Sequence, residues 1–323
     1  MTISALFIRR SSGPVCESER HGPDQHRNDL VRCLDSGPQS STAGPGKPGS
    51  GPGRRGSGPG SSTAGPESWY GERRRIHHKI IDMTGKLEGK TAVVTGGSRG
   101  IGRAIVTRLA ADGASVIFGY RARSAEAAEL ERTVPGARAV QADLAQPGAV
   151  HRLLDLAGDN LDILVANAAA SFTRTPFADI TEAEYDRIFT VNTRSTFQAI
   201  QYAATHMRDN GRIITVSTIN TVLPFPGDGV YIGSKGAVEQ FAAVAAKELG
   251  PRGITVNTVS PGATDTDLLR STNTEEGLAL SARLSPLGRL GEPEDIADVV
   301  AFLAGPDGRW ITGQNIHASG GII

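Results

Sequence analysis

The sequence contains few of the residues that mark disulfide-rich or membrane proteins. Only two cysteines, Cys16 and Cys33, are present, and both precede Met83, so no disulfide framework is expected. The range 83–323 contains no cysteine, which fits a reducing compartment, and we expect a cytoplasmic protein. No run approaches the roughly 20 apolar residues that a membrane-spanning helix needs, so no membrane association is predicted.

The chain also lacks an excess of charge of either sign, because 34 lysine and arginine residues balance 34 aspartate and glutamate residues. A nucleic-acid-binding domain is normally basic overall, so this balance argues against nucleic acid as a partner. The neutrality is the sum of two unlike parts. Residues 1–82 carry 12 basic and 8 acidic side chains, a net of +4, and residues 83–323 carry 22 and 26, a net of −4. The chain therefore divides near residue 83.

The composition of the range 1–82 differs from that of the rest. Between Ser36 and Pro66, every second position on average is glycine or proline, and the hexapeptide Ser-Ser-Thr-Ala-Gly-Pro occurs twice. Such a stretch buries too little apolar surface to offset its ordering entropy, so residues 1–82 are predicted to be a disordered tail. Met83 stands at the boundary and is a candidate natural start, which would make the tail an upstream extension.

Residues 83–323 alternate between short apolar runs and segments with helical spacing. Strands are predicted at 91–95, 114–118, 137–141, 161–166, 212–217, 254–259 and 311–318. Helices are predicted at 101–111, 124–132, 147–157, 181–207, 231–249 and 293–303. The fourth helix is expected to begin with a capping box of Thr181 and Glu184. This alternation predicts one α/β domain of the Rossmann type, a doubly wound parallel sheet of about seven strands with helices on both faces.

A glycine-rich turn follows the first predicted strand and opens the first helix, in the order Thr95-Gly96-Gly97-Ser98-Arg99-Gly100-Ile101-Gly102. Gly96 permits a tight turn, Gly100 a close approach of the backbone to a pyrophosphate, and Gly102 close packing of the helix on the sheet. The phosphates of a dinucleotide would then lie on free backbone N–H groups at the helix N-terminus. Ligands of such sheets bind at the carboxyl ends of the strands, which is where this turn lies.

The second predicted strand lacks the acidic residue that usually binds a free ribose 2′-hydroxyl. Its end reads Phe118-Gly119-Tyr120-Arg121. Arg99 in the glycine-rich turn and Arg121, next to Tyr120, could instead clamp a 2′-phosphate. The sequence therefore favours NADP(H) over NAD(H) as the cofactor.

Tyr231 and Lys235 are one helical turn apart at the start of a predicted helix, so they share a helix face. A free tyrosine has a pKa of about 10, and the nearby Lys235 ammonium is expected to lower the pKa of the Tyr231 phenol. Tyr231 could then act as general acid to a carbonyl or general base to an alcohol. The hydroxyls of Ser217 and Thr218 follow the fifth predicted strand, and Asn192 is a polar amide in an otherwise apolar helical stretch.

The same order of motifs continues with four further segments, which are Asp143, Asn167-Ala168-Ala169, Pro261-Gly262 and Ile311-Thr312-Gly313-Gln314. Together, these motifs make residues 87–321 resemble the short-chain dehydrogenase/reductase family, and most closely its 3-oxoacyl-[acyl-carrier-protein] reductase-like branch. The resemblance implies an NADP(H)-dependent carbonyl reductase or alcohol dehydrogenase. Such an enzyme transfers a hydride between nicotinamide C4 and a ketone or secondary alcohol, with a tyrosine as acid or base.

The resemblance also implies roles for individual residues. Tyr231 would be the acid/base, Lys235 would lower its pKa and bind the nicotinamide ribose, and Asn192 would hold a water in a proton relay. The substrate-orienting hydroxyl is normally a serine, but counting back from Tyr231 by the family spacing reaches Thr218, with Ser217 as the alternative. The other implied cofactor contacts are Ser98, Ile101, Asp143, Leu144, Asn167, Ala168, Ala169, Pro261, Gly262, Thr264 and Thr266.

Family habit further implies a homotetramer, or a homodimer, that acts on a small-molecule carbonyl without a metal. Three segments are expected to select the substrate, 170–177, 219–230 and 267–285, the last as a polar lid. Acyl thioesters, sugars or polyols, and polyketide ketones all stay open as substrates. A dinucleotide-binding sensor without chemistry is an alternative function, and the intact Tyr231, Lys235 and Asn192 argue against it.

Overall fold

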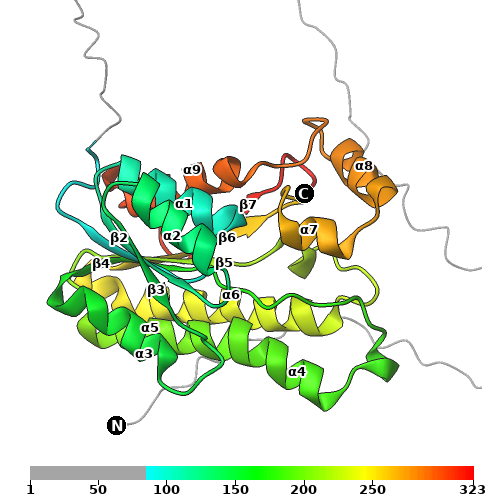
Figure 1. Ribbon diagram of the computed structural model, residues 1–323, viewed down its shortest axis with the longest axis horizontal. Helices are drawn as coiled ribbons and strands as arrows, with labels where there is room; N and C mark the ends of the chain where they lie inside the picture. The colour runs from blue at the N-terminus through cyan, green and yellow to red at the C-terminus, as the bar shows by residue number, and fades with distance from the viewer. Residues whose placement is uncertain (1–84) are drawn as a thin grey trace, which may run out of the picture. The chain divides into compact units, whose positions relative to one another are not determined.

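Seven apolar runs form the strands of one parallel sheet in the computed structural model, which describes residues 85–323 (Figure 1). The strands are β1 (Thr91–Val94), β2 (Ser115–Tyr120), β3 (Ala137–Gln141), β4 (Leu161–Ala166), β5 (Arg212–Val216), β6 (Thr255–Pro261) and β7 (Asn315–Ala318). Their order is β3-β2-β1-β4-β5-β6-β7, and every neighbouring pair is parallel. The predicted fold class is thereby confirmed. The predictions of a disordered tail over 1–82 and of a natural start at Met83 lie outside the described residues.

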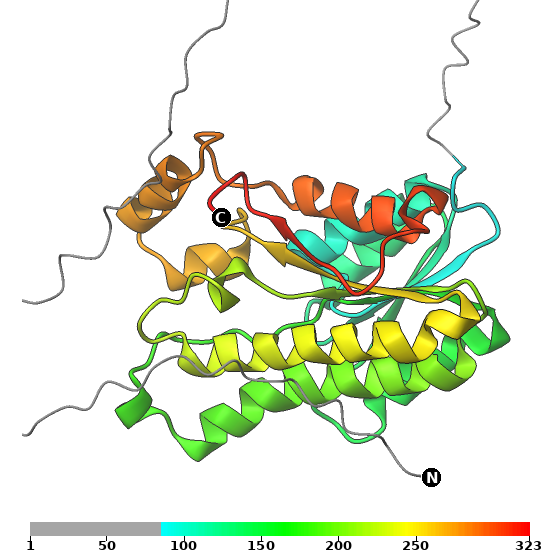
Figure 2. The same ribbon diagram turned by 180° about the vertical axis from the view of Figure 1, so that it is seen from behind.

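Helices cover both faces of the sheet (Figures 1 and 2). One face packs against α1 (Gly100–Ala111), α2 (Ser124–Thr133) and α9 (Pro293–Ala304), and the other against α3 (Ala149–Leu154), α5 (Ser195–His206) and α6 (Gly229–Leu249). Successive strand residues point to opposite faces. Val94 therefore joins the core beneath α1 and α9, while its neighbour Val93 joins the core beneath α5 and α6. Each such fully buried valine contributes roughly 1.5–3 kcal/mol of burial free energy.

The long helix predicted over 181–207 is interrupted. It consists of α4 (Glu182–Phe189), a π-helical turn (Thr190–Arg194) and α5. The Thr181 hydroxyl caps α4 as predicted, since it accepts the Glu184 N–H at 3.2 Å. The capping box is not completed, because the Glu184 carboxylate pairs with Arg187 at 2.8 Å. A π-turn inserts one extra residue per turn, and it frequently marks a functional position.

The segment predicted as a polar lid is helical. It forms α7 (Asp267–Thr272) and α8 (Glu275–Leu284), which lie beyond the carboxyl ends of β5 and β6 (Figure 1). The hydroxyls of Thr266 and Thr274 cap the two helices, accepting the N–H groups of Leu269 at 3.3 Å and Gly277 at 3.2 Å. None of the helices in residues 85–323 is both long and apolar enough to cross a membrane.

Candidate active site

A cavity of about 620 Å³ opens at the carboxyl ends of the strands, and almost every predicted site residue lines it. Those that line it are Gly96, Ser98, Arg99, Gly100, Ile101, Gly102, Tyr120, Arg121, Asp143, Leu144, Asn167, Ala168, Ala169, Ser217, Thr218, Tyr231, Lys235, Pro261, Gly262, Thr264 and Thr266. Asn192 is the exception, because its side chain is fully buried behind the cavity wall. The described residues contain no cluster of three or more potential metal ligands.

The glycine-rich turn forms one end of the cavity. Gly96 and Gly100 adopt positive φ angles of 68° and 50°, which other L-residues rarely adopt. A Cβ atom on Gly102 would lie 2.1 Å from the carbonyl oxygen of Gly96, so only glycine fits there. Helix α1 begins after Arg99 without a side-chain cap, so its first N–H groups have no side-chain acceptor. An uncapped helix start that faces a cavity suits a phosphate group.

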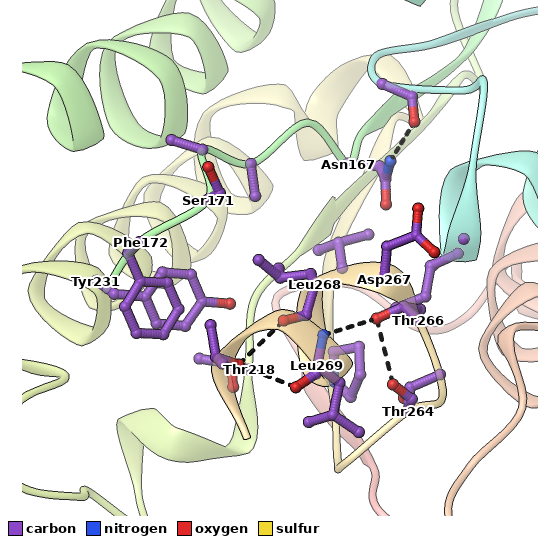
Figure 3. A pocket seen from close by; sticks show the side chains of 18 of the residues that line it. Asn167, Ser171, Phe172, Thr218, Tyr231, Thr264, Thr266, Asp267, Leu268 and Leu269 are labelled. Carbon is purple, nitrogen blue, oxygen red and sulfur yellow. Dashed lines mark hydrogen bonds between the residues drawn. The ribbon is translucent and has the colours of Figure 1, made fainter. Parts of the chain in front are cut away.

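Asn167 holds this turn against the sheet. Its amide nitrogen Nδ2 donates to the carbonyl oxygens of Thr95 and Gly96, both at 3.0 Å, while its backbone N–H donates to the Thr95 hydroxyl. Its side chain therefore links the end of β4 to the turn after β1 (Figure 3). Asp143, predicted to meet the adenine, turns its carboxylate back to accept the N–H of Ala145 at 3.1 Å.

Arginines gather where the second strand meets the glycine-rich turn. Arg99 lies 3.4 Å and Arg123 3.5 Å from the carboxylate of Asp267, the first residue of α7, and Arg123 also pairs with Glu126 at 2.7 Å. Arg121 has no ion-pair partner within residues 85–323. Neither Arg123 nor the contact of Asp267 with these arginines was predicted, because neither residue lies in a motif.

Tyr231 lies in the first turn of α6 and is 9% exposed. The ring of Phe172 stacks on its ring, with centroids 4.2 Å apart and planes at 11° (Figure 3). The pKa of the Tyr231 phenol is raised to about 12, mainly by burial; hydrogen bonding with the Thr218 hydroxyl opposes this rise, and the charge of Asp228 adds to it. Lys235 is not among the groups that shift this pKa, so the expected lowering of the Tyr231 pKa by Lys235 is not seen in the structure.

Lys235 explains that difference, since its ammonium is directed to the strand. Nζ donates to the carbonyl oxygen of Val216, the last residue of β5, at 2.7 Å, and the residue is 3% exposed. Burial lowers the pKa of Lys235 to about 8, and the carboxylate of Glu239 opposes this shift. The two residues share a helix face as predicted, but the lysine's hydrogen bond goes to the strand.

The two candidate hydroxyls at the end of β5 have different partners. Ser217 Oγ donates to the carboxylate of Glu239 at 2.6 Å. Thr218 Oγ1 accepts the N–H of Asn220 at 3.2 Å and lies close enough to Tyr231 to hydrogen-bond the phenol. Thr218 is therefore the hydroxyl that neighbours Tyr231 in the cavity.

Asn192 lies in the π-turn and is fully buried. Its Oδ1 accepts the N–H of Ala170 at 2.7 Å, and its Nδ2 donates to the Ser234 hydroxyl at 2.9 Å. Ser234 in turn donates to the carbonyl oxygen of Tyr231 at 2.6 Å. The amide thus joins the segment after β4 to the first turn of α6, which supplies the partner that a buried polar group needs.

A buried carboxylate next to Tyr231 was also missed. Asp228 precedes α6, and its side chain is fully buried. It accepts Arg174 Nε at 3.1 Å and Asn220 Nδ2 at 3.2 Å. Arg174 lies 6.0 Å from the centre of the Phe225 ring. The pairing ties the two loops that flank the cavity to the start of α6, and no short motif in the sequence signals it.

The chain is similar to known proteins. Residues 96–323 match the family model described as enoyl-(acyl carrier protein) reductase. An uncharacterized oxidoreductase of Methylorubrum extorquens is 43% identical over 249 residues, 73% of this chain and 99% of the relative. Versicolorin reductase of Emericella nidulans is 42% identical over 259 residues, 74% of this chain and 97% of the relative. The crystal structure of the angucycline C-6 ketoreductase LanV with bound NADP has a TM-score of 0.69 and 42% identity, and covers 74% of this chain and 97% of that one.

The chain therefore belongs to the short-chain dehydrogenase/reductase family, as its motifs predict.

Proposed function

We propose that this protein is an NADP(H)-dependent carbonyl reductase that interconverts a ketone and a secondary alcohol. One observation carries the proposal. A single cavity joins the uncapped start of α1 to a buried tyrosine, with Thr218 and Lys235 beside that tyrosine. The solved relative LanV binds NADP, and the curated relative from Emericella is named as a reductase.

Tyr231 is the proposed proton donor to the carbonyl oxygen of the ketone. Its phenol has a pKa of about 12, so it is protonated at neutral pH, which is the form a general acid needs. Thr218, next to the phenol, would orient the same oxygen by a hydrogen bond. The Lys235 charge would stabilise the phenolate that forms on proton donation. Bound NADPH would supply the hydride.

The cavity fits such a cofactor at both ends. The free N–H groups of α1 and the close approach that Gly96, Gly100 and Gly102 permit suit the pyrophosphate. Lys235 would contact the nicotinamide ribose. The other predicted contacts near the nicotinamide are Asn167, Pro261, Gly262, Thr264 and Thr266.

We propose NADP(H) rather than NAD(H), because arginines and not an acidic residue follow the second strand. Arg99 and Arg121 both line the cavity, and Arg121 has no carboxylate partner within residues 85–323. Arg123 adds a third guanidinium to the same end of the cavity. Such a group suits a 2′-phosphate.

Among the open substrate classes, we favour a cyclic or aromatic ketone of the polyketide type over a sugar or an acyl thioester. The cavity wall beyond Tyr231 is mainly apolar, with Phe172, Leu223, Phe225, Leu280 and Leu284. Apolar and aromatic walls with few polar groups suit an aromatic ligand better than a polyol. The named activities of the relatives from Emericella and of LanV point to the same class. A cytoplasmic homotetramer, or homodimer, stays our prediction for the assembly.

A substrate panel tests the proposal. Bicyclic aromatic ketones, acyl thioesters and ketoses are each offered with NADPH and with NADH, and Tyr231→Phe serves as the inactive control. We expect turnover of the aromatic ketones with NADPH, and a loss of at least 100-fold, on the order of a lost general acid, in Tyr231→Phe. Arg99→Ala with Arg121→Ala should weaken NADPH far more than NADH. Tight cofactor binding without turnover of any ketone would instead favour a dinucleotide sensor.

A further inference from the structure

Glu239 lies on the same face of α6 as Tyr231 and Lys235, and its side chain also contacts the end of β5. Tyr231, Lys235 and Glu239 are spaced four residues apart and share one face of the helix. With a rise of 1.5 Å per residue, they span roughly 12 Å of it. At the end of β5, Val216 and Ser217 hydrogen-bond to Lys235 and Glu239, and Thr218 lies next to Tyr231. The family motif accounts for Tyr231 and Lys235 but assigns no role to Glu239.

The contact made by Glu239 is short and buried on the strand side. Ser217, which is 4% exposed, donates its hydroxyl to the Glu239 carboxylate at 2.6 Å. Hydroxyl–carboxylate bonds of this length are charge-assisted and roughly twice as strong as neutral ones. Because Ser217 immediately precedes Thr218, the bond holds the backbone from which the Thr218 hydroxyl projects. Glu239 thus acts on Thr218 through Ser217.

Glu239 also supplies the charge that opposes the desolvation of Lys235. Within residues 85–323, it is the one charged group that shifts the pKa of Lys235, and it shifts it upward. β6 and the turn Ile219–Thr221, which pack on α6, contain no ionisable side chain, and β5 carries one only at its other end, Arg212. Asp228 acts on Tyr231.

The neighbouring helices and turns of α6 do carry ionisable side chains. They are Glu182, Glu184, Tyr185, Asp186, Arg187, Arg194, Tyr202, His206 and Arg252, with Lys247 and Glu248 on α6 itself. None of them shifts the pKa of Lys235. Among the groups on α6 and on the elements packed against it, Glu239 is therefore the one whose charge acts on Lys235.

We propose that Glu239 is a positioning residue of this active site: its carboxylate holds Ser217, and with it Thr218, and its negative charge stabilises the Lys235 ammonium. The proposal rests on the proposed reductase function for its catalytic consequence. The effect of Glu239 on Lys235 does not depend on any substrate. The positioning role of Glu239 and the reductase function can therefore be tested separately.

Lysine NMR tests the effect on Lys235 directly. The chain has only six lysines, so Cε signals of protein labelled with ε-¹³C lysine are few, and Lys235→Met identifies the relevant one. We expect Lys235 to titrate near pH 8 in the wild type, and roughly half a unit to one unit lower in Glu239→Gln, which removes a nearby opposite charge. Glu248→Gln, an exposed change on the same helix, should leave the midpoint unchanged. Equal midpoints in the wild type and Glu239→Gln overturn the proposal, whatever the activity.

The pH profile of ketone reduction gives a second readout. Glu239→Gln keeps an amide oxygen that can accept Ser217, so near pH 6.5 its kcat should stay within about threefold of wild type, while its alkaline limb moves to lower pH as the Lys235 midpoint does. Glu239→Ala removes both the acceptor for Ser217 and the negative charge, so its kcat should fall roughly tenfold near pH 6.5 and its alkaline limb should move to lower pH as in Glu239→Gln. An active wild type whose profile Glu239→Gln leaves unchanged defeats the positioning role alone. An inactive wild type with a shifted Lys235 midpoint defeats the reductase function alone.

Discussion

The two neighbouring hydroxyls after β5, those of Ser217 and Thr218, have different partners. This difference indicates which of the two can orient the substrate. The Ser217 hydroxyl is committed to the Glu239 carboxylate, whereas the Thr218 hydroxyl lies beside the Tyr231 phenol. A substrate oxygen that receives a proton from Tyr231 would come within reach of Thr218 first. The β-branched threonine is restricted in its side-chain rotamers, so its hydroxyl is held with little entropy to lose.

Alanine substitution should separate the two hydroxyls. Thr218→Ala removes the orienting hydrogen bond, and we expect kcat/KM for a ketone to fall about 100-fold, as loss of one such donor typically costs. Ser217→Ala acts only through position, and should cost about tenfold or less. Thr218→Ser keeps the hydroxyl and serves as the conservative control, near wild type. Steady-state kinetics on the three variants decide, and a silent Thr218→Ala beside an inactive Ser217→Ala would reverse the assignment.

At the scale of elements, the start of α1 depends on the absence of one side chain. Gly102 fits against the carbonyl oxygen of Gly96, where a Cβ would approach to 2.1 Å. The nearest atom is backbone and the Asn167 amide nitrogen would lie 2.6 Å away, so an added methyl must push the helix from the turn. The same displacement would move the N–H groups that are proposed to bind the pyrophosphate.

Gly102→Ala should therefore weaken both the fold and the cofactor site. We expect about 1–3 kcal/mol of destabilisation from overpacking and at least a tenfold loss of NADPH affinity. Gly236→Ala is the matched control, because nothing lies within 4 Å of an added Cβ at this position of α6, and alanine there should stabilise the helix by roughly 0.5–1 kcal/mol. Thermal unfolding and NADPH fluorescence titration measure both effects. Equal stability and affinity in the two variants would contradict the argument.

The sequence pattern predicted the bounds of most helices and strands to within a few residues, because the spacing of apolar residues and the positions of turn residues are local properties of the sequence. Strands β3 and β4 have the predicted bounds, and the Thr181 cap is present. The π-turn around Asn192 was not predicted, since one inserted residue barely changes the apolar spacing of a long helix. No helix was predicted over the polar lid segment 267–285, where α7 and α8 lie, because the threonine caps that start them stand in a largely polar sequence.

The contacts within the site were less predictable than the residues that line it. Motifs placed most of the predicted residues in the cavity, but the partners of the buried charges come from elsewhere in the chain. Arg174 meets Asp228, and Ser217 meets Glu239, across loops and helices whose approach the pattern does not specify. The expected lowering of the Tyr231 pKa by Lys235 was wrong, since burial raises this pKa and the Lys235 ammonium donates to Val216.

At the scale of the whole molecule, the buried Lys235 should couple folding stability to pH. Its pKa is about 8 in the folded protein, against 10.5 for an unperturbed lysine. Between these values the unfolded chain holds a proton that the folded protein has released, so the free energy of unfolding contributed by Lys235 rises with pH. Below pH 8 both states are protonated, and the folded state bears the full cost of a buried charge.

Comparison with Lys235→Met isolates this contribution, because other titrating groups, including the Tyr231 phenol, cancel in the difference. From pH 7 to pH 10 we expect wild type to gain roughly 2–3 kcal/mol of unfolding free energy relative to Lys235→Met, as a pKa difference of about two units implies. Urea unfolding of both proteins without cofactor, at four pH values across this range, measures the gain. A difference that stays constant would mean that Lys235 keeps an ordinary pKa when folded, and that solvent or the Glu239 carboxylate compensates for its burial completely.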